Sequence, residues 1–122
     1  MRHVLITAGT KGIGRRVAFQ FLKEGYSVTI NYRKDDVAKE QLAKEWEQFS
    51  DRLQFIKGDV SKKEDIEALF EETLTRFTRI DCLIHNAGPF VFERKKVSEY
   101  NEEEWSDILH GNLSAVFRLT KL

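Results

Sequence analysis

The chain has 122 residues, and its 20 lysines and arginines balance 20 aspartates and glutamates to a formal net charge of zero. This length fits one domain, and a neutral chain is not expected to bind nucleic acids through general charge. Hydrophobic residues make up 41% of the chain, which suffices for a packed core and excludes a disordered polymer. The single cysteine, Cys82, excludes a disulfide framework and a cysteine-based zinc site, and no histidine spacing indicates a metal.

The apolar runs of the sequence are short. None of them approaches the roughly 20 residues that a membrane span needs. The run near the N-terminus covers only residues 4–6, and no small-residue cleavage site of a signal peptide follows it. We therefore expect a cytoplasmic protein with no membrane partner.

Four short runs of apolar and β-branched residues alternate with longer segments. In chain order the runs are 4–6, 28–32, 53–56 and 82–84. Continuous apolar runs of this length are typical of strands buried on both faces of a parallel sheet. The segments between them repeat apolar residues at helical spacing, which predicts right-handed βαβ units. The predicted fold class is a doubly wound α/β structure that binds ligands beyond the carboxyl ends of its strands.

The helical segments carry their own start and packing signals. The first segment repeats apolar residues at helical spacing, namely Ile13, Val17 and Phe21 together with Ala18 and Leu22. The third opens with the sequence 61–64, Ser-Lys-Lys-Glu, which is the pattern of a capping box. The last opens at Asn101 with three glutamates in its first turn, where negative charge complements the helix dipole. Its apolar stripe is expected to face inward, has no stop signal before residue 122, and comprises Trp105, Ile108, Leu109, Asn112, Leu113, Val116, Phe117 and Thr120.

A glycine-rich turn connects the first predicted strand to the first predicted helix. Glycines permit positive φ and close approach of a phosphate, and the free amides and dipole at the helix start attract that phosphate. In this context the turn predicts a dinucleotide site, although a tight turn that binds nothing is the alternative. The candidate residues are Gly9, Thr10, Lys11, Gly12, Ile13 and Gly14.

The end of the second predicted strand indicates which dinucleotide is bound. An NAD site would place an Asp or Glu there to bind the ribose 2′-hydroxyl. This chain has Arg33 and Lys34 instead, and no carboxylate before Asp35. A cation would pair with a 2′-phosphate, and Lys11 in the glycine-rich turn points the same way. We therefore expect NADP(H) in preference to NAD(H), with a merely solvated cationic loop as the alternative.

Three more polar features follow predicted strands or lie on the last helix. Asp59 could accept a hydrogen bond from an exocyclic amine such as that of adenine, or simply shape a turn. The small-residue segment 86–88, Asn-Ala-Gly, could let a flat ligand pass close to the backbone, or be an ordinary strand exit. Asn112 lies between Leu109 and Leu113 on the apolar stripe, and a buried amide needs hydrogen-bond partners. It is therefore either part of a structural network or a site residue.

Taken together and in this order, these motifs resemble the N-terminal half of a classical short-chain dehydrogenase/reductase. The resemblance rests on residues 7–14, which are similar to the family's Thr-Gly-x-x-x-Gly-Ile-Gly, on Asp59-Val60, on 86–88 and on Asn112 in Gly-Asn-Leu-Ser. Tyr32 and Arg33 are similar to the branch of 3-oxoacyl-(acyl-carrier-protein) reductases and glucose dehydrogenases. The resemblance implies a Rossmann-type parallel sheet in three αβα layers.

The resemblance also implies roles for single residues. Gly12, Ile13 and Gly14 would lie against the cofactor phosphates, and Asp59 would bind the adenine amine with Val60 beside the ring. Residues Asn86, Ala87 and Gly88 would line the cofactor, and Asn112 would be the catalytic asparagine that holds a water in a proton relay. Two positions depart from the family pattern: Ala8 stands at the first glycine of the loop, and His85 where another asparagine is frequent.

The family's catalytic Ser and its Tyr-x-x-x-Lys have no match within residues 1–122. Tyr26, Tyr32 and Tyr100 are followed four positions later by Ile30, Asp36 and Glu104, and none of these is a lysine. The resemblance thus implies a dinucleotide-binding domain over residues 1–122 that stops before the Tyr/Lys segment. These residues alone are expected not to catalyse hydride transfer.

The sequence therefore predicts an oxidoreductase that, at full length, transfers a hydride between NADP(H) and a small carbonyl or alcohol substrate. A homo-oligomer is expected for the full-length protein, and a nucleic-acid partner is not. Two alternatives stay open: a non-catalytic NADP(H)-binding protein of the same fold, and another Rossmann-type enzyme such as a methyltransferase that uses S-adenosylmethionine.

Overall fold

The structure is a computed structural model, and it describes residues 1–87 and 96–121. Within these residues, all strands pair in parallel in one four-stranded sheet. Their order is β3-β2-β1-β4, so the chain adds strands outward from β1 in one direction and then crosses to its other side. The strands are β1 (His3–Ile6), β2 (Ser27–Tyr32), β3 (Leu53–Lys57) and β4 (Cys82–Ile84). The predicted strands and the doubly wound parallel sheet are confirmed.

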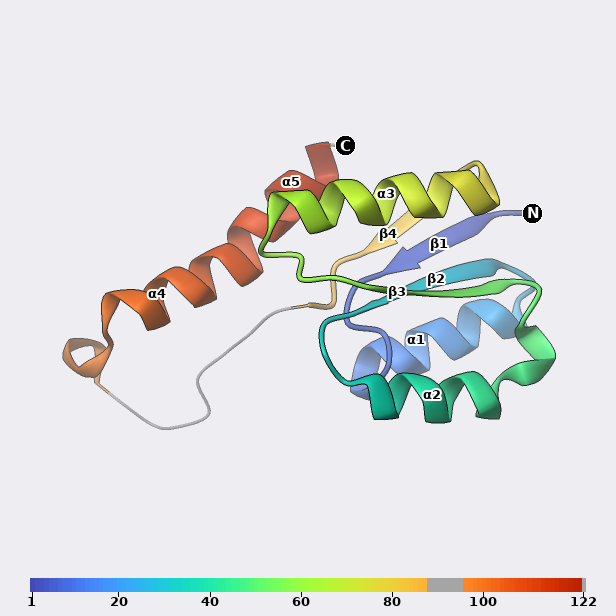
Figure 1. Cartoon of the computed structure of the whole chain (residues 1–122), viewed down its shortest axis with the longest axis horizontal. Coiled ribbons are helices and arrows are strands. Elements are labelled where there is room, and N and C mark those ends of the chain that lie inside the picture. The colour runs from blue at the N-terminus through green and yellow to red at the C-terminus, as the bar shows by residue number, and fades with distance from the viewer. Residues whose placement is uncertain (88–95, 122) are drawn as a thin grey trace.

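Helices cover both faces of this sheet. Figure 1 shows α1 (Gly12–Lys23) and α2 (Asp36–Glu45) below the strands, and α3 (Lys63–Phe77) and α5 (Ala115–Lys121) above them. The helix α4 (Glu102–Leu109) extends away from the sheet and continues through a π-helical turn, His110–Ser114, into α5. Short 3-10 helices occupy Glu47–Phe49 and Val97–Glu99. The predicted three-layer αβα arrangement is therefore confirmed.

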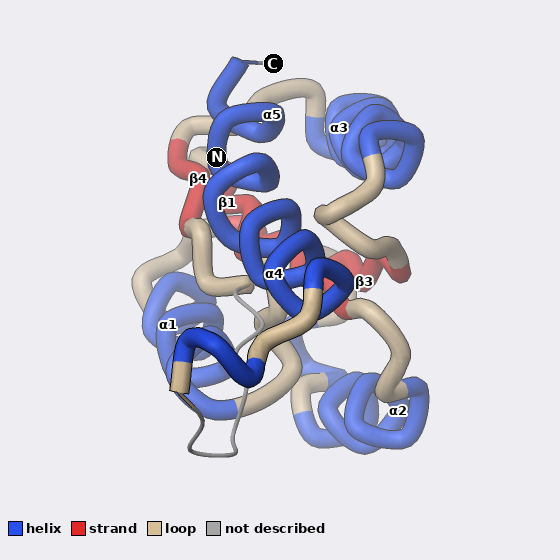
Figure 2. The backbone as a smooth tube through the Cα atoms, turned by 90° about the vertical axis from the view of Figure 1, so that its left-hand side faces the viewer, coloured by secondary structure: helices blue, strands red, loops and turns tan. Residues whose placement is uncertain are grey.

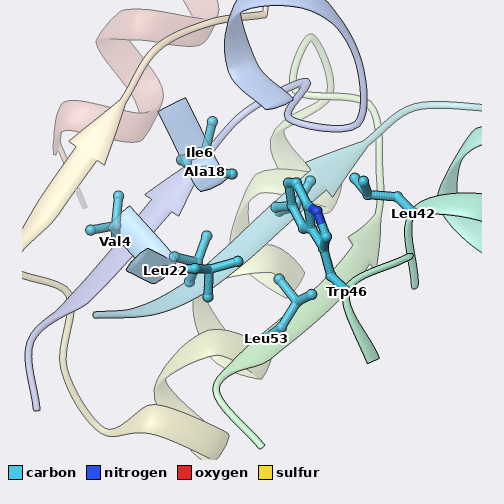
Figure 3. Packing of buried hydrophobic residues seen from close by; sticks show 9 residues of the cluster. Val4, Ile6, Ala18, Leu22, Leu42, Trp46 and Leu53 are labelled. Atoms are coloured by element: carbon cyan, nitrogen blue, oxygen red, sulfur yellow. The ribbon is translucent and has the colours of Figure 1, made fainter. Parts of the chain in front are cut away.

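The central strand β1 divides the core between the two faces. Its residues Val4 and Ile6 pack toward α1 and α2, where Leu22 and Trp46 cover them (Figure 3). Leu5 points to the opposite face and packs with the apolar side chains of α3 and α5, namely Ile66, Leu69, Ala115 and Leu119. Alternate side chains of a strand point to opposite faces, so a run of consecutive apolar residues supplies both cores.

The start of α3 differs from its prediction. The capping box expected at Ser61 and Glu64 is wrong, because α3 begins at Lys63 with Lys62 at the N-cap position. The Ser61 hydroxyl instead donates to Asp59 Oδ1 at 2.7 Å. A capping box forms at α4, where Asn101 Oδ1 accepts from the Glu104 amide at 2.7 Å. The Ser61 hydroxyl therefore bonds to a carboxylate in the preceding turn and does not accept a hydrogen bond from the amide that the pattern assigned to it.

Two predicted apolar stripes also need correction. In α1, Ile13 is 75% exposed, whereas Ala18 and Leu22 of the predicted apolar face are buried, together with Gly14. Trp105, Leu113 and Phe117 were expected to face inward, but each is about 65% exposed. The described part of the chain covers α5 only along the narrow edge formed by Ala115 and Leu119. The apolar residues of this last helical segment therefore spread over more of its surface than the sheet and α3 cover.

Among the described residues, no helix combines the length and the apolar character that crossing a membrane requires.

At the amino end of the sheet, His3 is fully buried between neighbouring strands. Its Nδ1 lies 2.7 Å from the Ser27 hydroxyl and its Nε2 lies 2.7 Å from the Thr29 hydroxyl. The imidazole also stacks on Phe77, with ring centroids 4.2 Å apart. Burial lowers the pKa of His3 from 6.5 to about 4, although the negative charge of Asp81 opposes the shift. The folded protein therefore keeps this imidazole neutral in mild acid.

Because the unfolded chain binds a proton at His3 more readily than the folded chain does, stability should fall as the pH drops from about 6.5 towards 4. We expect His3 to account for a loss of about 2 kcal/mol in the free energy of unfolding over this range. Urea denaturation at a series of pH values should show a shallower loss in His3→Gln than in the unsubstituted chain. Parallel losses in the two proteins would contradict this assignment, and so would an NMR titration of His3 with a midpoint above about pH 6.

Candidate nucleotide-binding site

The polar loops of the chain meet at the carboxyl ends of the strands, the edge of the sheet that Figure 2 views. Backbone hydrogen bonds join neighbouring loops there. The Thr7 amide donates to Ile84 O and the Gly9 amide to Asn31 O, both at 3.1 Å. The Gly58 amide donates to Tyr32 O at 2.9 Å. The loops after β1, β2, β3 and β4 are thus held side by side, as ligand sites in open α/β sheets require.

Thr7 and Asn86 clamp the glycine-rich turn to the end of β4. The Thr7 hydroxyl accepts hydrogen bonds from the backbone amides of Asn86 (3.0 Å) and Ala87 (2.9 Å). In return, Asn86 Nδ2 donates to Ala8 O at 2.9 Å. The side chain of Asn86, which the family resemblance places beside the cofactor, therefore also shapes the glycine-rich turn. Gly88, expected to line the same surface, lies outside the described residues.

The glycines of the turn serve two different purposes. A Cβ added to Gly14 would lie 2.5 Å from Asn86 Nδ2 and 2.7 Å from Ala8 O, so this position has no room for a side chain. A Cβ added to Gly9 would lie 2.8 Å from the side chain of Ile30. Gly12 has a φ of +54°, and no heavy atom of the described residues lies within 4 Å of its added Cβ. Gly9 and Gly14 are needed for packing, whereas Gly12 leaves the start of α1 open to a ligand.

Ala8 occupies a conformation that glycine adopts more readily. Its φ is +54°, which is the left-handed region that costs a residue with a Cβ about 1 kcal/mol. The turn nevertheless closes with the hydrogen bond from Asn86 Nδ2 to Ala8 O. Alanine in place of the family's glycine therefore leaves the path of the turn unchanged, but it strains the backbone at this residue.

Both predicted cations lie at this edge, and each faces a carboxylate. Lys11 Nζ pairs with Asp35 Oδ2, and Arg33 Nε lies 3.9 Å from Asp59 Oδ2. The hydrogen bond from Lys11 lowers the pKa of Asp35, with a further contribution from the backbone amide of Ala38. All four side chains retain solvent-exposed surface. Lys11 and Arg33 thus lie where the sequence predicts them, but each is paired with a carboxylate, and the pairing of Asp35 with Lys11 was not anticipated.

An open cleft of about 820 Å³ lies between the starts of α1 and α2. Lys11 and Gly12 form one side, and Asp35 lies on the other. Thr10, Arg15, Val37, Ala38, Gln41, Leu42, Lys44 and Glu45 complete its lining. Across one end of the cleft, Arg15 of α1 pairs with Glu45 of α2. Lys11 is the N-cap residue of α1 and Asp35 that of α2, so two helix starts border the same cleft.

Asp59 is held by the turn that follows β3. Its Oδ1 accepts from both the amide (2.9 Å) and the hydroxyl (2.7 Å) of Ser61. Burial raises the pKa of Asp59, but these hydrogen bonds and the charge of Arg33 outweigh it and hold the pKa below its usual value. Asp59 therefore shapes this turn, which is one of the two roles that its place in the sequence allows. Val60 is buried in the core beneath α3 and α5.

Asn112 lies in the π-helical turn between α4 and α5. It is partly buried, and its Nδ2 donates to Ile108 O at 2.9 Å. Single π-helical turns within longer helices occur frequently at functional sites. Near this segment, His85 Nε2 lies 3.1 Å from the Thr120 hydroxyl and links the end of β4 to α5. Within the described residues, no group of three or more His, Cys, Asp or Glu side chains is arranged to hold a metal ion.

The chain matches the family described as short chain dehydrogenase over residues 2–122, and it belongs to that family. Over 121 residues it is 57% identical to YtkK of Bacillus subtilis (strain 168), whose name describes it as an oxidoreductase. The alignment covers 99% of this chain and 48% of that protein. The chain thus spans about half the length of the curated relatives it matches.

Two solved structures share the fold. A Bacillus thuringiensis protein described as a 3-oxoacyl-reductase is 50% identical, with a TM-score of 0.96 over 99% of this chain and 50% of that one. The actinorhodin polyketide ketoreductase, solved with NADPH, is 30% identical. Its TM-score is 0.88 over 98% of this chain and 45% of that one. The Rossmann-type fold is confirmed by these likenesses.

The two kinds of glycine in the turn should respond differently to alanine. Gly14→Ala should lower the free energy of unfolding by about 2 kcal/mol or more, because its Cβ would meet Asn86 and the Ala8 carbonyl. Gly12→Ala, in open space, should cost only about 1 kcal/mol of left-handed strain. Chemical denaturation of both variants tests this difference. Equal losses would contradict the packing role of Gly14.

Replacing Ala8 with glycine should relieve the strain of its positive φ. The gain is partly offset by the greater freedom of glycine in the unfolded chain, so we expect Ala8→Gly to stabilise by about 0.5 kcal/mol. Ala18→Gly in the buried face of α1 is the matched control and should destabilise the chain. Thermal denaturation of the two variants compares them directly, and a destabilised Ala8→Gly would show that the turn tolerates alanine without strain.

Proposed function

We propose that residues 1–122 form the dinucleotide-binding domain of an NADP(H)-dependent short-chain oxidoreductase. The observation that carries the proposal is the open start of α1, where Gly12 leaves room for a ligand beside the ammonium of Lys11. Unsatisfied backbone amides and the helix dipole at such a position bind phosphate. The related ketoreductase, whose structure contains NADPH, supports the same class of cofactor.

The residues around the turn fit the parts of NADP(H). The diphosphate would lie against the amides of residues 12–14, and the 2′-phosphate near Lys11 and Arg33. The Asp59 carboxylate keeps a partly exposed side chain that could accept a hydrogen bond from the adenine amine. The backbone amides of Asn86 and Ala87 bond to Thr7, and Asn86 Nδ2 bonds to Ala8 O, so these two residues would line the cofactor while they hold the turn in place.

When bound, NADP(H) supplies or accepts the hydride that is exchanged with a carbonyl or alcohol carbon of the substrate. The chain's own residues bind and orient the cofactor. Asn112 would help to position a water for proton transfer, a role that the family resemblance implies and that its place in a π-helical turn supports, because such turns are frequent at functional sites. The proton donor itself would come from a Tyr-x-x-x-Lys outside residues 1–122, since none of the three tyrosines has a lysine four positions later.

For the whole protein we propose a small carbonyl or alcohol substrate, with the 3-oxoacyl class supported by the description of the Bacillus thuringiensis relative. A cytoplasmic homo-oligomer is part of the same proposal. A methyltransferase of similar fold is disfavoured by the cations Lys11 and Arg33, because S-adenosylmethionine carries no phosphate for them to bind. Its ribose hydroxyls would favour an acidic partner instead.

Titration of the protein with NADPH, NADH and S-adenosylmethionine tests the cofactor class. We expect the tightest binding for NADPH. Arg33→Gln should weaken NADPH binding about tenfold and NADH binding much less, because a charge-assisted contact with the 2′-phosphate is lost. Lys23→Gln, which removes the same charge from the far end of α1, is the matched control. Preferential binding of S-adenosylmethionine would overturn the proposal.

A further inference from the structure

The carboxylate of Asp35 makes two separate interactions at the edge of the cleft. Its Oδ1 accepts a hydrogen bond from the Ala38 amide at 2.9 Å and thereby caps α2. Its Oδ2 pairs with the ammonium of Lys11, across the start of α1. The side chains of Lys11 and Asp35 are 65% and 38% exposed, so a ligand can reach both of them.

This pairing sets up a competition for the Lys11 ammonium. A 2′-phosphate that binds Lys11 must share the ammonium with Asp35 or displace it, and the phosphate and the nearby carboxylate then repel each other. A ribose 2′-hydroxyl meets the opposite situation, because a carboxylate after the second strand is a favourable acceptor for it. Asp35 therefore acts against NADP(H) and in favour of NAD(H), beside a second cation, Arg33, which itself lies 3.9 Å from the Asp59 carboxylate.

We propose that Asp35 is a specificity-determining residue that reduces the preference of this site for NADP(H) over NAD(H). The proposal rests on the proposed function, since it concerns the same cofactor site. Arg33 and Lys11 attract the 2′-phosphate, and Asp35 withholds part of that attraction by neutralising Lys11. The Lys11 hydrogen bond also lowers the pKa of Asp35, so the carboxylate keeps its charge at neutral pH.

The chain offers a substitution that separates the two interactions of Asp35. Asparagine is as good an N-cap residue as aspartate, so Asp35→Asn keeps an acceptor for the Ala38 amide and removes only the charge. The matched control is Asp36→Asn. Asp36 is the next residue, lies in the first turn of α2 and is also exposed, but it pairs with Lys57 Nζ at 3.0 Å and does not line the cleft.

The experiment measures the dissociation constants of NADPH and NADH for the unsubstituted protein and both variants. The quenching or enhancement of nicotinamide fluorescence reports binding without catalysis. We expect Asp35→Asn to bind NADPH about threefold to tenfold more tightly and NADH no more tightly, because an exposed ion pair is of modest strength. Asp36→Asn should change both constants by less than about twofold. The gain for NADPH should shrink as ionic strength rises.

A double-mutant cycle gives a second measurement. If Asp35 acts through Lys11, then Asp35→Asn should improve NADPH binding less in a Lys11→Gln background than in the unsubstituted one. Asp35→Ser, which also retains a good N-cap residue, replaces Asp35→Asn if the latter fails to fold. Circular dichroism confirms that each variant keeps its helices.

The outcomes separate the two proposals. Unchanged or weaker NADPH binding in a folded Asp35→Asn overturns the role of Asp35 while the proposed function stands. An equal gain in Asp36→Asn also overturns it, because a general loss of negative charge would then explain the effect. Binding of neither nucleotide to the unsubstituted protein overturns the proposed function, and the role of Asp35 with it.

Discussion

The hydrogen bonds between Thr7 and the end of β4 hold the candidate site together. One hydroxyl accepts from two successive amides of residues 86 and 87, and the Asn86 side chain returns a hydrogen bond to Ala8. These contacts join two segments that are about 80 residues apart in sequence. They fix the turn from which α1 begins, and the lack of space at Gly14 follows from the same contacts. The open surface at Gly12 depends on this fixed turn.

Features that depend on residue type and local order were predictable from the sequence. The apolar runs around Val4 and Val28 form adjacent strands of the sheet, and the glycine-rich turn lies where a strand meets a helix. The cations Lys11 and Arg33 lie at the expected edge. The strands follow from the burial of neighbouring residues, the turn from the conformational freedom of glycine, and the cations from their place in loops that follow strands, and a sequence displays all three directly.

Features that depend on competition between partners were not predictable in the same way. Ser61 matched a capping pattern, but its hydroxyl bonds to Asp59 in the preceding turn. In the sequence Asp35 is only the first carboxylate after the second strand, and the closeness of two helix starts in the fold is what brings it to Lys11. The periodicity of the last helix shows how much apolar surface it has, but not how much of that surface a neighbour covers. Choices among several nearby partners are settled by the three-dimensional arrangement.

The two tryptophans occupy opposite environments. Trp46 is 5% exposed in the core below the sheet, next to Leu42, which lines the cleft between α1 and α2 (Figure 3). Trp105 is 65% exposed on α4. An indole in an apolar core and one in water differ in their emission, so the protein carries two intrinsic fluorophores that report on different regions. The emission of Trp46 follows the integrity of the core beside the cleft, while that of Trp105 responds to whatever approaches α4.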